Sequence, residues 1–342
     1  MRDRARRRSE EDWDDHALYE TEREGRWSAE TAEAGRSFIL PEGAAWVDLF
    51  SPSEEEKWLV GKILGIDIPT RAEMQEIEVS SRLYQEDGAF FMTANILTRI
   101  EQDHIDSSAI TFILAGQRLV TVRYSEPRPF QAYPARLVRS SSQCSSSPDI
   151  LLGLLETIID RLADILEMSA GAVNDISRRV FRPAESQGVP EPHLQGLLID
   201  IGVEGDHVSK IRESLVSISR MSMFLTQAVS GYTTCADFRE RLLSLARDVT
   251  SLADHATFVA NKITFLLDAT LGMLSIAQNN IIKIFSVAAV VFLPPTLIAS
   301  IYGMNFQHMP ELSHEYGYYG AIALMIVSAI TPYVYFKRKK WL

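Results

Sequence analysis

The sequence predicts an α+β membrane protein with an N-terminal mixed α/β cytoplasmic domain, a long coiled-coil-like helical stalk and two C-terminal transmembrane helices. Three observations predict this fold class: two uncharged apolar runs near the C-terminus, a long heptad pattern before them, and strand-like segments in the first half of the chain. We expect a disordered extension at residues 1–36, the α/β domain at 37–145, the stalk at 146–280 and the transmembrane domain at 281–342.

The two apolar runs are long enough to cross a bilayer. Residues 284–301 and 318–336 contain no charged side chain, and the first run begins at Ile281. A helix needs about 18 to 20 such residues to cross ~30 Å of hydrocarbon. We therefore expect spans at about 281–302 and 318–336, joined by an outer loop at 303–317. The alternative is a buried helical hairpin in a soluble protein.

The charge pattern predicts the orientation of these spans. Before Ile281 the chain has 29 basic and 43 acidic residues, a net charge of −14, whereas the rest has five basic and two acidic residues, a net charge of +3. Positive residues mark the cytoplasmic side of a membrane. Four of them follow the second span: Lys337, Arg338, Lys339 and Lys340. Two spans then place both termini in the cytoplasm.

The α/β domain is predicted from local signals. The segments "GAFFMTANILTRI" and "AITFILAGQRLVTVRY" are rich in β-branched and aromatic residues, as strands are, and "AGQR" is the expected hairpin turn. Ser51 is the expected N-cap of a helix, with Pro52 at its first position and Glu54 closing a capping box. The polar segment "SSSQCSSSP" then marks the boundary to the stalk.

The stalk has a heptad pattern that leads into the first span. Apolar residues alternate in steps of four and three at Phe238, Leu242, Leu245, Val249, Leu252, Ala256, Val259, Ile263 and Leu266. No proline interrupts this pattern before Pro294, so one helix is expected over 236–300. Such a helix can transmit a conformational change in the cytoplasmic domain to the membrane. A coiled coil that serves assembly alone fits the pattern equally well.

Composition and motifs exclude several function classes. An acidic chain argues against nucleic acid as a partner, because phosphate binding requires clustered Lys and Arg. The sequence has no GxxxxGK[ST] phosphate loop and no Ser-His-Asp or Cys-His arrangement, so we expect neither an enzyme nor a bound cofactor. Cys144 and Cys235 belong to no CxxC pattern, and we expect free thiols in a reducing compartment.

One stripe of the first span differs from the rest. A heptad drawn through this span contains mostly small or polar residues: Asn279, Ile282, Ser286, Ala289, Leu293, Thr296 and Ser300. Such a stripe either lines an aqueous pore or packs against another helix, and the pattern alone favours neither. Two spans cannot enclose an aqueous path, so a pore requires a cyclic homo-oligomer. Neither span contains an acidic residue, which suits an ion that keeps its water shell, as Mg²⁺ does.

The segment "YGMNFQHMPEL" after the first span resembles the signature of the CorA family of magnesium and cobalt transporters, and is most similar to its enterobacterial type. The similarity extends through "QNNIIKIFSVAAVVFLPPTLIASIYGMNF" and "PYVYFKRKKWL". It implies a funnel-shaped homopentamer in the inner membrane that admits Mg²⁺, and also Co²⁺ or Ni²⁺, and that cytoplasmic Mg²⁺ closes. Mg²⁺ is then both substrate and regulatory ligand, and the remaining partner is membrane lipid.

The resemblance also assigns roles to residues. It implies a selectivity filter of Gly303, Met304 and Asn305, polar pore positions at Asn279 and Thr296, and apolar constrictions at Ile282 and Leu293 with Phe285 beside them. Lys337, Arg338, Lys339 and Lys340 match the cytoplasmic basic collar of the family. Regulatory acids match poorly, and Asp87, Asp248 and Asp254 are the candidates.

Two features leave alternatives open. Gln307 and His308 stand where the family often has an acid, so recruitment of cations to the outer loop is left to Glu311 and Glu315. The same superfamily includes zinc transporters, and loop histidines suit Zn²⁺. An alternative of another class is a membrane-anchored oligomeric sensor or scaffold, which would not require Gly303, Met304 and Asn305.

Overall fold

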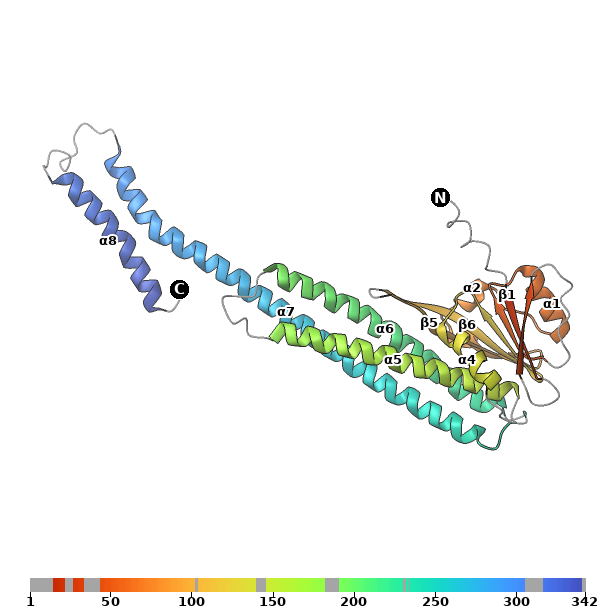
Figure 1. Ribbon diagram of the computed structural model, residues 1–342. Coiled ribbons are helices and arrows are strands. Elements are labelled where there is room, and N and C mark those ends of the chain that lie inside the picture. The colour runs from red at the N-terminus through yellow and green to blue at the C-terminus, as the bar shows by residue number, and fades with distance from the viewer. Residues whose placement is uncertain are drawn as a thin grey trace, which may run out of the picture. The chain divides into compact units, whose positions relative to one another are not determined.

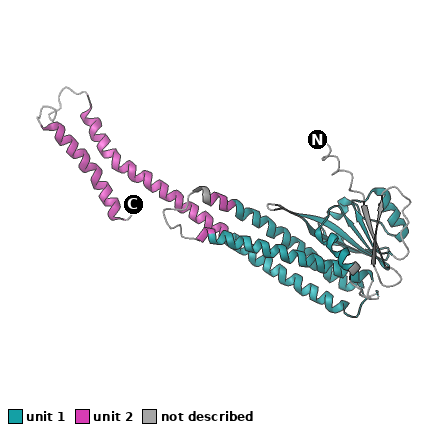
Figure 2. Ribbon diagram, in the orientation of Figure 1, with its two compact units in different colours: residues 1–178, 199–265 teal, residues 179–198, 266–342 magenta. Residues whose placement is uncertain are grey.

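The computed structural model describes residues 15–21, 27–33, 44–101, 104–139, 146–181, 191–229, 232, 234–304 and 316–339. The chain divides into two compact units (Figure 2). The first unit comprises residues 1–178 and 199–265, and the second comprises residues 179–198 and 266–342.

The first unit contains a seven-stranded sheet in the order β2-β1-β3-β7-β6-β5-β4. All neighbouring strands are antiparallel except β3 and β7, which are parallel. The strands are β1 (Asp15–Thr21), β2 (Trp27–Glu33), β3 (Ala44–Phe50), β4 (Leu83–Glu86), β5 (Ala89–Glu101), β6 (His104–Ala115) and β7 (Arg118–Arg123).

Two tight turns set the register of the antiparallel part. Gly116 has a φ of 57° in the turn between β6 and β7, which confirms the hairpin predicted at "AGQR". Asp87 and Gly88 both have positive φ, 51° and 76°, between β4 and β5. Two successive residues with positive φ are the geometry of the hairpin turn that follows strand twist most closely, and Asp-Gly is a preferred sequence for it.

Both faces of the sheet are buried. Successive side chains of a strand point to opposite faces, so neighbouring residues belong to different core clusters. On β6, Phe112 and Leu114 belong to one core cluster, and Ile113 and Ala115 belong to another. The second cluster includes residues of the short N-terminal helices α1 (Glu54–Leu64) and α2 (Arg71–Met74). The small helix α3 (Val79–Arg82) leads into β4.

Long helices cover the other face (Figure 1). They are α4 (Arg128–Arg139), α5 (Ser147–Phe181), α6 (Glu191–Ala228) and the first part of α7 (Phe238–Tyr302). The predicted heptad residues of α7 are buried within the single chain, except Leu252, which is half-buried. Most of this seam therefore belongs to the core of the first unit and is satisfied without a second copy.

The predicted start of α1 is wrong by two residues. Ser53, rather than Ser51, is the N-cap, and its capping box is closed by Glu56 rather than Glu54. The segment "SPSEEE" contains two overlapping Ser-x-x-Glu frames, so sequence does not distinguish them. The structure does, because Ser51 has a φ of 48° and donates its N–H to the carbonyl of Arg123 at 2.8 Å, at the end of β3.

Strands β1 and β2 lie inside residues 1–36, which the composition assigned to disorder. They pair with each other along seven positions, and β1 also pairs with β3. The expectation of disorder is therefore corrected for these two strands. Charged neighbours obscured the alternation of the short strand segments, and only pairing with β3 makes a strand at this edge favourable.

The expectation of free thiols is wrong for Cys235, which is disulfide-bonded. Cys144 lies outside the described residues. No described cysteine is free. The absence of a dense cysteine pattern misled the sequence interpretation, because pairing between cysteines far apart in sequence depends on the tertiary structure.

Candidate functional site

The second unit contains the two helices that can cross a membrane, the end of α7 and α8 (Gly317–Arg338). Only 6 % of the apolar window of α7 and none of that of α8 is buried. A core helix of a soluble protein would be mostly buried. The low burial therefore argues against the alternative of a buried hairpin and favours two membrane spans.

The structure leaves the whole predicted stripe of α7 exposed. The exposed fraction is 61 % for Ile282 and 65 % for Leu293, and Phe285 beside the stripe is 71 % exposed. The same is true of the small and polar members of the stripe, which are Asn279, Ser286, Ala289, Thr296 and Ser300. Nothing in the described part of one chain covers this face.

The covered face of α7 lies on the other side of the helix. Val287 is buried, with 6 % of its surface exposed, and Val291, Pro294 and Ile298 are half-buried. These four residues follow each other in steps of four, three and four. At about 100° per residue they lie roughly opposite the predicted stripe. One face of the span is therefore packed within the chain, while the predicted stripe is available to other molecules.

On the exposed stripe, the hydroxyl of Thr296 can only accept hydrogen bonds. Its Oγ1 donates to the carbonyl of Phe292 at 2.7 Å. A hydroxyl has one hydrogen to donate and two lone pairs to accept with, so only lone pairs remain. Pro294 and Pro295 lie inside α7 and lack an N–H, so the carbonyls four residues before them lose their helical donors. The middle of the span thus has an excess of hydrogen-bond acceptors.

The predicted filter begins where α7 ends. The N–H of Gly303 donates to the carbonyl of Ala299 at 2.9 Å, and that of Met304 donates to Ile301 at 3.3 Å. A Cβ at position 303 would lie 3.0 Å from the Ala299 oxygen, so the close turn favours glycine. Asn305 lies outside the described residues, as do Glu311, Glu315 and Lys340.

The described residues of the predicted basic collar lie at the end of α8. Lys337 and Arg338 occupy the last helical turn, and the N–H of Lys339 donates to the carbonyl of Tyr335 at 3.1 Å. All three side chains are exposed. Cations at a helix C-terminus interact favourably with its unpaired carbonyls.

The three predicted regulatory acids are exposed and separated. Asp87 lies in the turn between β4 and β5, and Asp248 and Asp254 lie on α7. Six helical residues separate the last two, which places them on different faces of α7. Within the described residues of one chain, no group of three His, Cys, Asp or Glu side chains could hold a metal ion.

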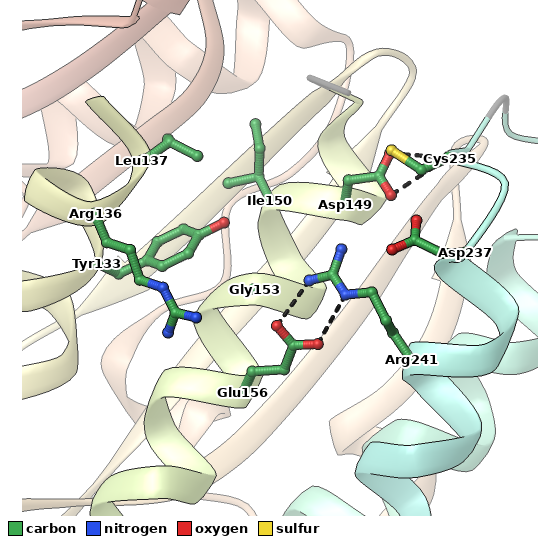
Figure 3. A pocket seen from close by; sticks show the side chains of 10 residues that line it. All are labelled: Tyr133, Arg136, Leu137, Asp149, Ile150, Gly153, Glu156, Cys235, Asp237 and Arg241. Atoms are coloured by element: carbon green, nitrogen blue, oxygen red, sulfur yellow. Dashed lines mark hydrogen bonds and ion pairs between the residues drawn. The ribbon is translucent and has the colours of Figure 1, made fainter. Parts of the chain in front are cut away.

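Sequence reasoning missed a polar cavity of about 360 Å³ in the first unit (Figure 3). Arg241 of α7 forms a bidentate pair with Glu156 of α5, with distances of 2.9 and 2.7 Å. The hydrogen bond to Glu156 raises the pKa of Arg241, and burial opposes this rise. The sequence contained one signal for this cavity, which was the recurrence of polar residues at helical spacing among the apolar residues of α5. The cavity is lined by Tyr133, Arg136, Leu137, Asp149, Ile150, Gly153, Glu156, Cys235, Asp237 and Arg241.

Fold and site together define a class of protein: a membrane protein with a mixed α/β domain, a helix that runs from this domain into the first span, and a second span at the C-terminus. The family described as CorA-like Mg²⁺ transporter protein matches residues 41–338. The chain therefore belongs to the CorA family.

Individual relatives and solved structures agree with this assignment. The chain is 37 % identical over 301 residues to the magnesium transport protein CorA of Escherichia coli K12, covering 87 % of this chain and 92 % of the relative. It is 36 % identical over 297 residues to CorA of Yersinia pseudotuberculosis, with the same coverage of 87 % and 92 %.

Two solved structures share the fold. The complete CorA magnesium transporter of Methanocaldococcus jannaschii matches with a TM-score of 0.72 at 19 % identity, over 96 % of this chain and 98 % of that one. The full-length CmaX protein matches with a TM-score of 0.66 at 12 % identity, over 97 % and 100 %.

Proposed function

We propose that this protein is a Mg²⁺ channel that admits divalent cations into the cell, driven by the membrane potential. The observation that supports this most strongly is the exposed stripe of α7, which lies opposite the covered face of the span, in a chain of the CorA family. Both relatives named above are magnesium transport proteins. Co²⁺ and Ni²⁺ are further expected substrates.

The chemistry of the stripe suits an ion that crosses with its water shell. Mg²⁺ loses its waters reluctantly, and those waters present hydrogen-bond donors to their surroundings. The lone pairs of Thr296 on this stripe are such acceptors. Acceptors without formal charge can hold hydrated cations weakly enough to release them, as conduction requires. We assign Gly303, Met304 and Asn305 as the filter at the outer end of this path.

Inward transport needs no chemical energy source. A divalent cation moving inward gains about 4.6 kcal/mol per 100 mV of membrane potential, twice the value for a single charge. That energy supports accumulation of roughly a thousandfold. Transport therefore requires no energy-consuming step, but it does require a means of limiting ion entry.

The open stripe also implies assembly. One chain leaves Ile282, Phe285 and Leu293 exposed, and two spans cannot enclose an aqueous path. A cyclic homo-oligomer encloses such a path when each copy contributes the same helix face. We propose the homopentamer that the family resemblance implies, with the stripes of α7 around the axis and lipid outside.

The proposed orientation places both termini in the cytoplasm. The basic residues Lys337, Arg338 and Lys339 follow α8 directly, and positive residues remain on the cytoplasmic side. The acidic body then lies inside the cell, where its net charge of −14 before Ile281 attracts cations. Mg²⁺ bound between copies would reduce their mutual repulsion and favour the closed state, with Asp87, Asp248 and Asp254 as exposed candidate ligands.

Ion flux into proteoliposomes tests the proposal. Vesicles that contain a Mg²⁺-sensitive dye and an imposed inside-negative potential are compared for the native chain, Asn305→Ala and the control Asn280→Ala. We expect flux that follows the potential, falls at least about tenfold in Asn305→Ala and is retained in the control, because only Asn305 lies in the proposed filter.

Other outcomes would assign the protein differently. Movement of Zn²⁺ in place of Mg²⁺ would keep the fold and change the substrate. The absence of flux for every divalent ion tested would contradict the channel and support the membrane-anchored sensor.

A further inference from the structure

The second span has one covered face, as the first span has. On α8 the half-buried residues recur in steps of four, four, three and four at Ala321, Met325, Ala329, Pro332 and Phe336. The corresponding row on α7 begins at Val287, and both rows belong to the same compact unit. The two covered faces therefore pack against each other, as neighbouring spans do in a membrane.

Two lysines continue these faces beyond their covered part. Lys283 lies one helical turn before Val287, and Lys339 lies three residues after Phe336. Residues three or four positions apart lie on the same side of a helix. Lys283 is therefore on the side of α7 that faces α8, and Lys339 is on the side of α8 that faces α7.

The two lysines also lie at nearly the same depth. Two spans joined by one loop run in opposite directions, so equal distances from the loop mean equal depth. Lys283 precedes Tyr302, the last residue of α7, by 19 residues, and Lys339 follows Gly317, the first residue of α8, by 22 residues. At ~1.5 Å per residue, the difference in depth is about 5 Å.

This end of the spans contains no acidic residue. The sequence has none between Asp268 and Glu311 and none after Glu315, and the two glutamates lie in the loop that joins the opposite ends of the spans. Both lysines are exposed, and neither belongs to an ion pair among the described residues. Two like charges on facing helices repel each other, so an anion between them is stabilised by both.

We propose that Lys283 and Lys339 bind the phosphate of an anionic phospholipid between the cytoplasmic ends of the two spans. The proposal rests on the proposed function only for the leaflet, because the orientation given there places these ends on the cytoplasmic side. A bound phosphate also lowers the positive charge that a Mg²⁺ ion meets when it leaves the path.

The surroundings favour a lipid as the source of the anion. Tyr333 and Tyr335 are 46 % and 59 % exposed just before the basic residues of α8, and such rings prefer the level of the lipid headgroups. A lysine near the end of a span lays its stem along apolar surface and places its charge at that level. Basic groups between spans on the cytoplasmic side bind acidic headgroups in other membrane proteins. The phosphate oxygens can accept hydrogen bonds from both ammonium groups.

Arg338 provides a matched control for charge alone. It is exposed and directly precedes Lys339, so it has the same charge at nearly the same depth. It follows Phe336 by two residues, about 200° around the helix, and therefore lies on the side of α8 away from α7. A diffuse attraction of acidic lipid to the basic residues predicts equal effects at positions 338 and 339, whereas a site between the spans predicts unequal effects.

The test is native mass spectrometry of the full-length protein in detergent, titrated with phosphatidylglycerol or with phosphatidylcholine. This method resolves individual bound lipids and reports in the same spectrum whether each variant keeps its assembly. We expect the native chain to bind phosphatidylglycerol at least about tenfold more tightly than phosphatidylcholine. Lys283→Gln and Lys339→Gln should each weaken phosphatidylglycerol binding about fivefold, Lys283→Arg should retain it, and Arg338→Gln should change it less than about twofold.

Three results would overturn the proposal. The first is equal affinity of the native chain for the two lipids, and the second is equal weakening by Arg338→Gln and Lys339→Gln. The third is retention of inorganic phosphate at 10 mM, with loss of the bound lipid, which would assign the two lysines to a soluble anion. None of these measurements depends on ion transport. A chain that conducts no ion would therefore contradict the proposed function, while lipid binding still decides this site.

Discussion

The two units place similar side chains in opposite surroundings. Trp46 and Phe112 are fully buried in the first unit, whereas Phe285 and Leu293 on α7 are 71 % and 65 % exposed. A sheet covered on both faces by helices completes its core within one chain. The spans have no such core, and their apolar surface must be covered by lipid or by other copies. The first unit thus has a core within one chain, whereas the membrane unit has none.

Polar groups show the same difference. Asp48 and Arg123 form a buried pair in the sheet with distances of 2.8 to 3.1 Å, and Asp48 also accepts from Thr121. All partners of this pair lie in the same unit. On α7, Thr296 finds one partner in its own helix and keeps free lone pairs on the exposed face. The unused acceptors lie where the account places the ion.

The same substitution at two leucines should test this comparison most strongly. Leu114 is fully buried and Leu293 is 65 % exposed. Leu114→Ala should lower the free energy of unfolding of the first unit by about 2–5 kcal/mol, because it leaves a cavity in the core. Leu293→Ala should change that quantity by less than about 0.5 kcal/mol and should raise ion flux by widening the path. Denaturant unfolding of the full chain in detergent measures the first effect, and vesicle flux measures the second.

A pair of glycines on α5 should give a smaller effect within the first unit. A Cβ at Gly153 would collide with the hydroxyl oxygen of Tyr133, whereas one at Gly171 would meet nothing within 4 Å. We expect Gly153→Ala to destabilise the unit by about 1–3 kcal/mol through overpacking. Gly171→Ala should stabilise it by up to about 1 kcal/mol, because alanine favours helix. Equal shifts of the unfolding midpoint in the two variants would contradict the packing assigned to Tyr133.

Alkaline pH should weaken the first unit slightly. Burial raises the pKa of Tyr84 to about 12, with smaller contributions from nearby acids such as Glu86, and burial also raises the pKa of Tyr133 and Tyr232. The unfolded phenols ionise near pH 10 and the folded ones do not. Stability from these groups is therefore fully present below about pH 10 and is lost as pH rises toward the folded pKa. Unfolding midpoints between about pH 9 and 11 should show this slope, and Tyr84→Phe should reduce it.

The sequence predicted the long periodic elements. Nine heptad positions on α7 and two uncharged runs are strong signals, because many residues repeat one pattern. The exposed stripe could be predicted for the same reason, since helical spacing places Ile282, Leu293 and Thr296 on one face. What no spacing could show is whether this face or the opposite one is packed within the chain.

The missed features depend on contacts between distant segments. Whether Ser51 or Ser53 caps α1 is decided by a hydrogen bond from Ser51 to Arg123, 72 residues later. The ion pair of Arg241 and Glu156 in the polar cavity likewise joins parts of the chain that are far apart in sequence. Local propensity contains no information about such pairs.

The central claim is that the exposed stripe of α7 lines the ion path, and Mg²⁺ flux through Thr296→Val tests it most directly. Thr331 on α8 is the matched control, because its Oγ1 donates to the carbonyl of Val327 at 2.7 Å, the distance found for Thr296. Both substitutions keep the side-chain shape and remove one intrahelical hydrogen bond. The account predicts that Thr296→Val lowers flux about tenfold, since acceptors for the hydrated ion are lost, and that Thr331→Val changes it less than about twofold. Equal flux in the two variants would contradict the claim.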